Sequence, residues 1–154
     1  MFLTLKLLIK NYTTMKTISK LLILLFPIII PYYICSQSYL IYNSQFKTKS
    51  SIVGCYQNNI IYKSEYNIVS NIIGVIKNNI IYKGQFISNS SIIGSFNNGY
   101  IYNSEFQNKS NIIGRYSNGF IYKKEFGSTF NIIGAYQGPD YVGPAAAMIL
   151  LLKK

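Results

Sequence analysis

Three acidic side chains at equivalent positions are the first candidates for chemistry in this chain. Glu65, Glu105 and Glu125 are separated by multiples of twenty residues. Carboxylate pairs can act as general acid and base when they lie about 5 to 10 Å apart. Gln45 and Gln85 hold the same position in two further copies, and a Lys or Asn stands two residues earlier. We therefore interpret the series as polar and ionic pairs across strands, not as catalytic groups.

The rest of the composition removes most catalytic chemistries. The 154 residues include no His, one Asp and two Cys, so His-based proton relays and His metal sites are excluded. Cys55 is a poor candidate for a nucleophile, because its place in the repeat is freely varied. The equivalent residues are Val75, Ser95, Arg115 and Ala135. We expect a protein that is not an enzyme and has no cofactor or metal.

The element that must position any site is a repeat of twenty residues. Its marker tripeptide recurs without insertion at 52–54, 72–74, 92–94, 112–114 and 132–134, which is a strong repeat signal. One unit reads IIGRYSNGFIYKKEF, and its Asn118-Gly119 pair lies between apolar and aromatic runs. Asn-Gly in this setting predicts a type I′ turn, hence a β-hairpin. The predicted hairpins span 52–66, 72–86, 92–106 and 112–126.

A two-residue turn also predicts the pairing within each hairpin. Tyr116 then opposes Ile121, and Gly114 opposes Lys123. If the same register continues along both strands, Ile112 opposes Glu125. The face that bears Gly114 hardly varies between repeats, so we expect copies of this face to meet around an axis. Glycine at that position lets large groups approach the backbone closely.

Two strands remain at the ends of the repeat region. Residues 39–46 form a second strand that lacks its first, and residues 132–137 form a first strand that lacks its second. If these two pair, they complete a fifth hairpin and leave no exposed sheet edge. We therefore predict an all-β fold, a closed symmetric ring or shallow barrel of five β-hairpins, with no long internal helix.

The N-terminal segment, 1–36, has the pattern of an export signal. Lys16 and Lys20 precede an apolar run over residues 21–35, and Ser36 opens the polar body. We expect a signal peptide that is cleaved after Ser36, and a retained hydrophobic anchor is the alternative. Cys35 follows Ile34, a residue too large for a typical lipid-attachment site. The expected location is therefore exported, either secreted or in the cell envelope.

The C-terminal segment, 139–154, is the third part of the chain, after the repeat domain at 37–138. Gly138 and Pro139 end the repeat, and the tail reads AAAMILLLKK from Ala145. Ten helical residues measure about 15 Å, half of a bilayer core, so this helix is too short to span a membrane. We expect Ala145 to Leu152 to plug the ring, with a membrane-interface anchor as the alternative.

These repeats resemble a known family, the four-fold beta flower proteins. The resemblance rests on the pattern IIGxYxNGxIYxxEF, followed by a Gly/Ala-rich stretch and a short Leu run, and it covers roughly residues 37 to 152. It implies a shallow ring of hairpin petals around an apolar centre, with no catalytic residues to transfer. This chain departs from the family by having five units instead of four. Another hairpin solenoid is the alternative, although this sequence has no Trp for choline-binding cages.

The charge points to an anionic partner. From residue 37 onward the chain has 11 basic and 4 acidic residues, a net charge of +7. Basic charge with dense aromatics also suits single-stranded nucleic acid, but we expect no such partner for an exported chain. The predicted function is a non-enzymatic envelope protein associated with membrane or anionic lipid; alternatively, the charge only keeps the protein soluble.

A secreted carbohydrate- or protein-binding module that uses exposed tyrosines is the second hypothesis. The candidate contact residues for a ligand or lipid are Tyr62, Tyr82, Tyr102, Tyr122, Lys63, Lys83 and Lys123.

Overall fold

The computed structural model describes residues 37–152, and every element discussed below lies within one compact unit, Ser38–Lys154. The predicted export signal at 1–36, with Cys35, and the terminal Lys153 and Lys154 lie outside the described residues. In the described part of the chain, no helix is long and apolar enough to cross a membrane.

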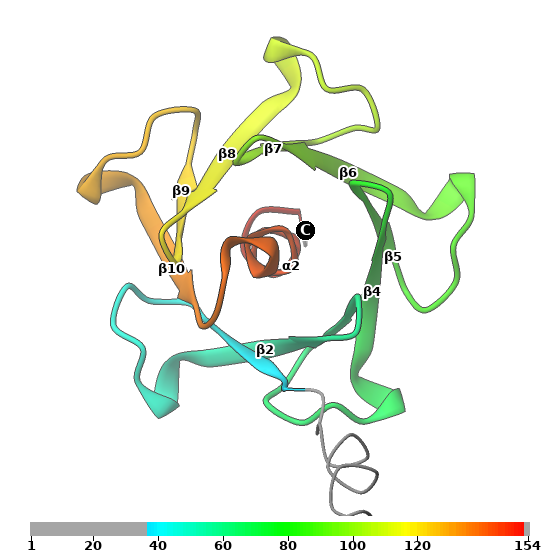
Figure 1. Ribbon diagram of the computed structural model, residues 1–154, viewed down its shortest axis with the longest axis vertical. Helices are drawn as coiled ribbons and strands as arrows, with labels where there is room; N and C mark the ends of the chain where they lie inside the picture. The colour runs from blue at the N-terminus through cyan, green and yellow to red at the C-terminus, as the bar shows by residue number, and fades with distance from the viewer. Residues whose placement is uncertain (1–36, 153–154) are drawn as a thin grey trace, which may run out of the picture. The chain divides into compact units, whose positions relative to one another are not determined.

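The described chain forms a closed antiparallel barrel of ten strands (Figure 1). The strands are β1 (Tyr39–Tyr42), β2 (Ile52–Gln57), β3 (Ile60–Tyr62), β4 (Ile72–Lys77), β5 (Ile80–Lys83), β6 (Ile92–Asn97), β7 (Tyr100–Tyr102), β8 (Ile112–Ser117), β9 (Phe120–Lys123) and β10 (Ile132–Tyr136). The terminal strands β1 and β10 pair through Ile41 with Tyr136, which confirms the fifth hairpin and the closed ring.

Short helical turns lead into the first strand of each hairpin and into the tail. They are 3₁₀ turns at Lys49–Ser51, Val69–Asn71, Asn89–Ser91, Lys109–Asn111, Thr129–Asn131 and Asp140–Val142. The tail itself consists of α2 (Gly143–Ala147) followed by η8, a π-helical turn at Met148–Leu152. The expectation of a short C-terminal helix is therefore confirmed.

The hairpin turns have the backbone that the Asn-Gly signal predicts. Asn118 and Gly119 take φ values of 52° and 81°, and Asn58 and Asn59 take 50° and 64°. Positive φ at both central residues is the mark of a type I′ turn, which matches the twist of the flanking strands. The predicted register follows, with Gly114 opposite Lys123.

The second strands are shorter than predicted, and the register at their ends is corrected. β9 stops at Lys123, so Ile112 does not oppose Glu125. Ile112 instead pairs with Tyr102 of the neighbouring hairpin, next to a register shift between Ile101 and Tyr102. The equivalent shift opposite the end of β9 lies in β10, between Ile132 and Gly134. Such a β-bulge bends the strand and ends its pairing, which frees the residues after Lys123 to form a loop.

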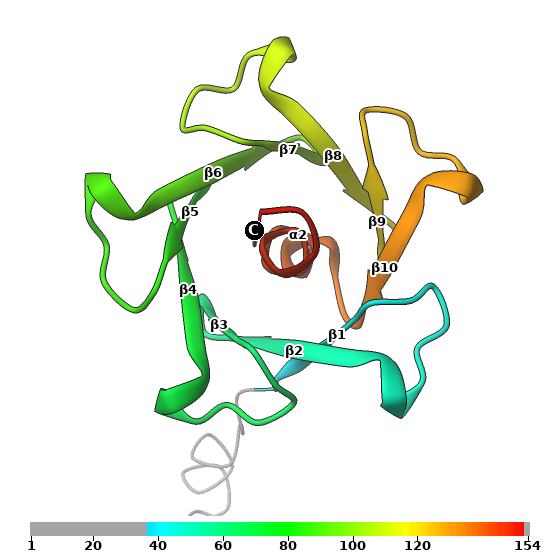
Figure 2. The same cartoon turned by 180° about the vertical axis from the view of Figure 1, so that it is seen from behind.

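Two ends of the barrel can be distinguished. The hairpin turns at 58–59, 78–79, 98–99 and 118–119 lie at one end, here called the turn end. At the other end, the loop end, the strands lead into the five loops 43–51, 63–71, 84–91, 103–111 and 124–131. These loops project around the ring like petals in both views (Figures 1 and 2).

The interior is built in layers that repeat once per hairpin. The central layer is a ring of fully buried isoleucines: Ile41, Ile61, Ile81, Ile101 and Ile121. A second layer, nearer to the turn end, is formed by four aromatic side chains and one isoleucine: Tyr56, Ile76, Phe96, Tyr116 and Tyr136. The apolar face predicted to meet around an axis is therefore the inner face of the barrel.

The tail runs through the centre of this ring (Figures 1 and 2). Ala145, Ala146 and Ala147 are fully buried, and Met148 is 3% exposed. Gly143 begins the tail against the ring of Tyr116, near the turn end, and Leu152 reaches the glycine layer described below. The prediction that this segment plugs the ring is thus confirmed.

A layer of inner glycines provides the space for the tail. An added Cβ at each glycine would come within 2.3 to 2.9 Å of one tail side chain. Each glycine has its own partner: Gly54 with Ile149, Gly74 with Met148, Gly94 with Leu152, Gly114 with Leu151, and Gly134 with Leu150. A backbone carbonyl oxygen of the neighbouring strand would also lie 2.4 to 2.8 Å from each added Cβ. Contacts this short exclude any side chain at these positions without displacement of both the tail and the strand backbone.

The π-helical turn matches the symmetry of the ring. The five residues from Met148 to Leu152 lie against the glycines of consecutive hairpins, in order around the barrel. An α-helix advances by about 100° per residue, whereas five hairpins around one axis stand about 72° apart. A π-helix, with bonds from i to i+5, has a longer turn and brings each residue closer to the next glycine. The change from α2 to the π-helical turn η8 therefore lets each successive tail residue lie against the glycine of the next hairpin.

Polar contacts hold the start of the tail at the turn end. The Tyr136 hydroxyl donates to Asp140 Oδ1 at 2.6 Å, and the Tyr141 hydroxyl donates to the Tyr39 hydroxyl at 2.7 Å. Burial, and then the hydrogen bond to Asp140, raise the pKa of Tyr136 well above its usual range. This phenol stays neutral and remains a donor, so it fixes the place where the chain turns into the barrel.

Deleting residues 145–154 tests the plug. Without the tail the inner glycines line an empty apolar cavity, and cavities of this kind strongly destabilise a fold. We expect the melting temperature to fall by about 10 °C or more, because 1 kcal/mol corresponds to several degrees in a domain of this size. The melting temperature is measured by thermal unfolding, monitored by circular dichroism. An unchanged melting temperature would show that the tail does not support the ring.

Candidate binding surface at the loop end

Three of the five loops are organised by a serine. Ser44, Ser64 and Ser104 accept, through Oγ, the backbone N–H of the residue two positions later, at 3.1 to 3.2 Å. In two of these loops an asparagine side chain also donates to the serine, with Asn71 at 2.6 Å and Asn111 at 2.9 Å. Such local side-chain bonds favour turns over continued strand. The serine therefore ends the strand early and folds the loop.

The other two loops lack this serine and take a different path. Gly84 and Lys124 stand in its place, with φ values of 78° and 75°. Their backbone N–H groups donate to Ile73 O at 2.8 Å and to Ile113 O at 3.1 Å. The strands that precede them are four residues long and include Lys83 or Lys123. We call 84–91 and 124–131 the positive-φ loops.

The four candidate tyrosines point to the outside of the barrel, where the loops cover them. Tyr62 is 7% exposed and Tyr82 and Tyr102 are 8% exposed, so the expectation of exposed rings is wrong for these three. Tyr122 is half-buried. The physical reason is that the polar loops fold back over the outer face, as two hydrogen bonds show. Ser95 Oγ donates to Ser104 O at 2.8 Å, and the Asn67 amide donates to Gln57.

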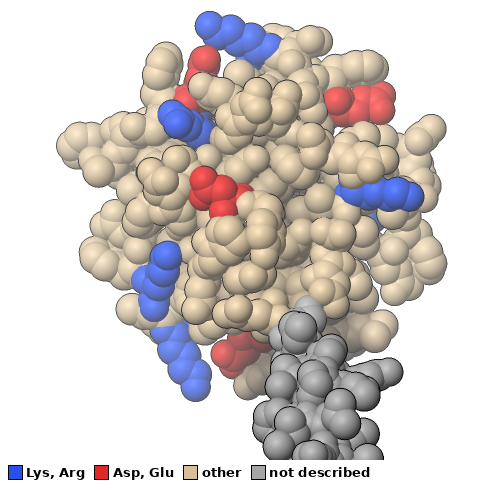
Figure 3. All heavy atoms as spheres, viewed as in Figure 1, with Lys and Arg blue, Asp and Glu red and all other residues tan. Residues whose placement is uncertain are grey.

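The candidate lysines are exposed and lie where the second strands end. Lys63, Lys83 and Lys123 extend from the loop end of their hairpins. On the face seen in Figure 1, where the hairpin turns lie nearest the viewer, basic and acidic side chains are interspersed without a large patch of either sign (Figure 3). The structure thus separates the predicted contact set, because the lysines reach solvent and three of the tyrosines do not.

The predicted polar pairs across strands are not present. Glu65, Glu105 and Glu125 lie beyond the shortened strands, in the loops. Within residues 37–152 a single ion pair is found, between Lys109 Nζ and Glu125 Oε1 at 4.0 Å. It joins neighbouring loops and is partly exposed, so its contribution to stability is small.

An exposed aromatic ring in every loop was missed by the sequence analysis. The set is Phe46, Tyr66, Phe86, Phe106 and Phe126, which are 63% to 73% exposed. Because the second strand was predicted to continue through position 126, these rings were placed on the outer face of a strand. The signal was present, since all five repeats keep an aromatic residue there, next to the polar linker.

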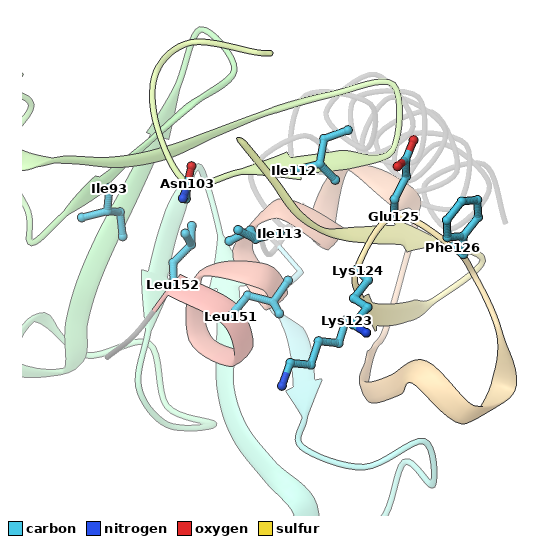
Figure 4. A pocket seen from close by; sticks show the side chains of 10 residues that line it. All are labelled: Ile93, Asn103, Ile112, Ile113, Lys123, Lys124, Glu125, Phe126, Leu151 and Leu152. Carbon is cyan, nitrogen blue, oxygen red and sulfur yellow. The ribbon is translucent and has the colours of Figure 1, made fainter. Parts of the chain in front are cut away.

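Among the described residues, a crevice opens at the loop end beside each positive-φ loop. The larger, about 690 Å³, has an apolar floor that includes Ile113, Leu151 and Leu152, with Lys123 and Lys124 at its side (Figure 4). The smaller, about 360 Å³, lies beside Lys83 and Gly84, and Met148 and Leu152 of the tail are part of its lining. Both combine the exposed end of the tail with basic side chains, a combination that suits an amphiphilic ligand.

The described residues do not place side chains in an arrangement that suits nucleophilic or metal chemistry. Across 37–152 no three His, Cys, Asp or Glu side chains gather as metal ligands would. The Cys55 thiol is fully buried on the outer face, opposite Tyr62. Burial raises the pKa of Cys55 to about 11, so the reactive thiolate is scarce at neutral pH.

The native Cys55 thiol should therefore resist alkylation. With a pKa of about 11, roughly one thiol in a thousand is ionised at pH 8, and the folded chain also shields it. In a Cys35→Ser variant, we expect little reaction with iodoacetamide at pH 8 and full reaction in denaturant, counted by mass spectrometry. Rapid modification of the native protein would contradict this environment.

Comparison with known proteins identifies the family to which the chain belongs. A family model described as 6-fold beta flower protein matches residues 41–147, nearly all of the barrel and the start of the tail. The resemblance to beta flowers is thus confirmed, but the four-fold designation is corrected to six-fold. Neither the comparison with curated proteins nor that with solved structures gave a match. The chain therefore belongs to the 6-fold beta flower family, and closes its ring with five hairpins.

Proposed function

We propose that this protein is a non-enzymatic, exported envelope protein that docks its loop end on a membrane rich in anionic lipid. The observation that supports this most directly is the joint presence, around one end of the barrel, of exposed aromatic rings, exposed lysines and the apolar end of the tail. The export pattern of residues 1–36 agrees with this location.

The aromatic rings are the apolar part of the proposed contact. Rings that are more than 60% exposed in all five loops are a recurring feature, not a single exposed residue. In the single loop 63–71, two aliphatic side chains, Val69 and Ile68, are also 76% and 53% exposed. Exposed apolar groups that recur in this way mark an interaction surface. Aromatic side chains on short loops also suit the headgroup level of a membrane, where such rings are enriched.

The lysines are the electrostatic part. Lys63, Lys83, Lys123 and Lys124 are exposed at the strand ends, and the only described acid in the larger crevice, Glu125, lies 4.0 Å from Lys109. A basic residue near an anionic membrane surface contributes about 1 kcal/mol. Two copies of this chain facing each other through the same end would bring like charges together, which disfavours self-association there.

The proposal predicts a position-dependent effect of charge in liposome flotation. Lys123→Gln and Lys77→Gln each remove one exposed positive charge, but Lys77 ends β4 at the turn end. For the chain from residue 37 onward, we expect Lys123→Gln to weaken binding to vesicles containing anionic lipid about fivefold, and Lys77→Gln to leave it nearly unchanged. Binding should also weaken with salt and be absent on neutral vesicles.

Two results would overturn the proposal. Equal effects of the two substitutions would show that net charge, not the loop end, drives binding. Absence of flotation in low salt would favour the protein- or glycan-binding alternative. Glycan binding is then measured as retention on immobilised polysaccharide, which should not depend on salt. The burial of Tyr62, Tyr82 and Tyr102 weighs against that alternative in its original form.

A further inference from the structure

The larger of these two loop-end crevices is built from both the strands and the tail. It is lined by the side chains of Ile93 and Ile113 from the strands and by Leu151 and Leu152 from the tail, all partly exposed. At about 690 Å³, it falls within the range of about 300 to 1,000 Å³ typical of small-ligand pockets. It has room for one ligand chain but not for a patch of bilayer.

Two adjacent lysines stand at this crevice, and no other hairpin has such a pair. The corresponding residues elsewhere are Asn43-Ser44, Lys63-Ser64, Lys83-Gly84 and Asn103-Ser104. Figure 4 shows Lys123 and Lys124 beside the leucines of the tail. Glu125 is also part of the lining, and its carboxylate forms an ion pair with Lys109, which is not among the lining residues. The basic groups therefore outnumber the acidic one at the opening.

Lys124 has a backbone conformation that lysine rarely adopts. Its φ of 75° lies in the left-handed region, which non-glycine residues seldom occupy outside turns rich in Asn and Asp. Gly84 occupies the equivalent position with a φ of 78° and no such penalty. An unfavourable residue in a place where the repeat elsewhere uses glycine suggests a role for the side chain, since strained residues cluster at binding sites.

We propose that this crevice binds a single-chain amphiphile with an anionic head, such as a long-chain fatty acid. The chain of the ligand lies on the apolar floor formed by Ile113, Leu151 and Leu152. Its carboxylate is held by the ammonium groups of Lys123 and Lys124, as charge-assisted hydrogen bonds allow. This proposal rests on the proposed function in using the same loop end, and it names the lipid class that this end recognises.

Site-resolved photolabelling of the full chain tests the proposal. The probe is a C16 fatty acid with a diazirine in its chain, used below its micellar concentration, and mass spectrometry maps the adducts. We expect adducts in 112–116 and 148–152, competed by palmitate but not by methyl palmitate. Adducts confined to other segments, or equal competition by the neutral ester, would overturn the proposal.

Lys124→Gly separates binding from stability. Glycine retains the loop, as Gly84 does, and relieves the positive φ, so we expect an unchanged or higher melting temperature with labelling reduced about fivefold. Lys124→Asn, which also tolerates positive φ, should lose labelling in the same way, whereas Lys77→Gln should not. Undiminished labelling in both Lys124 variants would overturn the proposal. So would a melting temperature that falls in both, because the lysine would then act only in the fold.

The two proposals can fail independently. Vesicle binding without labelling of the crevice would leave membrane docking in place and remove the fatty-acid site. Crevice labelling without vesicle flotation would do the reverse, and would identify a protein that binds free amphiphiles and not membranes.

Discussion

The contact between the inner glycines and the apolar tail is the interaction on which the rest of this structure depends. Five glycines, one per hairpin, leave a space that five consecutive tail residues fill. The barrel alone would enclose an empty apolar channel, and the tail alone is too short to be stable as a free helix. Each of the two elements therefore supplies the surface that the other must bury, and a closed ring without edges results.

A single tail breaks the symmetry of a fivefold ring, and the loops add to the asymmetry. The tail enters beside Tyr136 and Asp140 and ends at the loop end, so the five hairpins do not have equal neighbours there. Where serine gives way to glycine or lysine, at 84 and 124, the loop changes path and a crevice opens against the tail. Differences in one residue per repeat thus convert a symmetric scaffold into a surface with distinct sites.

Much of this architecture could be predicted from the sequence, because a fixed period and an Asn-Gly turn determine the register. That Tyr116 opposes Ile121 and that β1 pairs with β10 follow from local turn chemistry and from counting strands. That the tail enters the ring was predicted from its apolar sequence and from the space that the inner glycines leave. Where the second strand ends could not be predicted in this way. The bulge between Ile101 and Tyr102 and the Ser104 turn are tertiary and side-chain effects that hydrophobic alternation does not reveal. The exposed ring of Phe126 and the buried ring of Tyr102 were misplaced for this same reason.

The most direct test of this account is a pair of double-mutant cycles measured by equilibrium urea unfolding. Leu151 contacts Gly114, whereas Leu150 contacts Gly134, although the two leucines are neighbours in the same turn. Residues in contact show coupling energies of about 0.5 to 3 kcal/mol, and residues without shared partners are additive. We predict that Leu151→Ala offsets part of the destabilisation caused by Gly114→Ala, and that Leu150→Ala does not. Equal coupling of both leucines to Gly114, or none for either, would contradict a tail held in register with the hairpins.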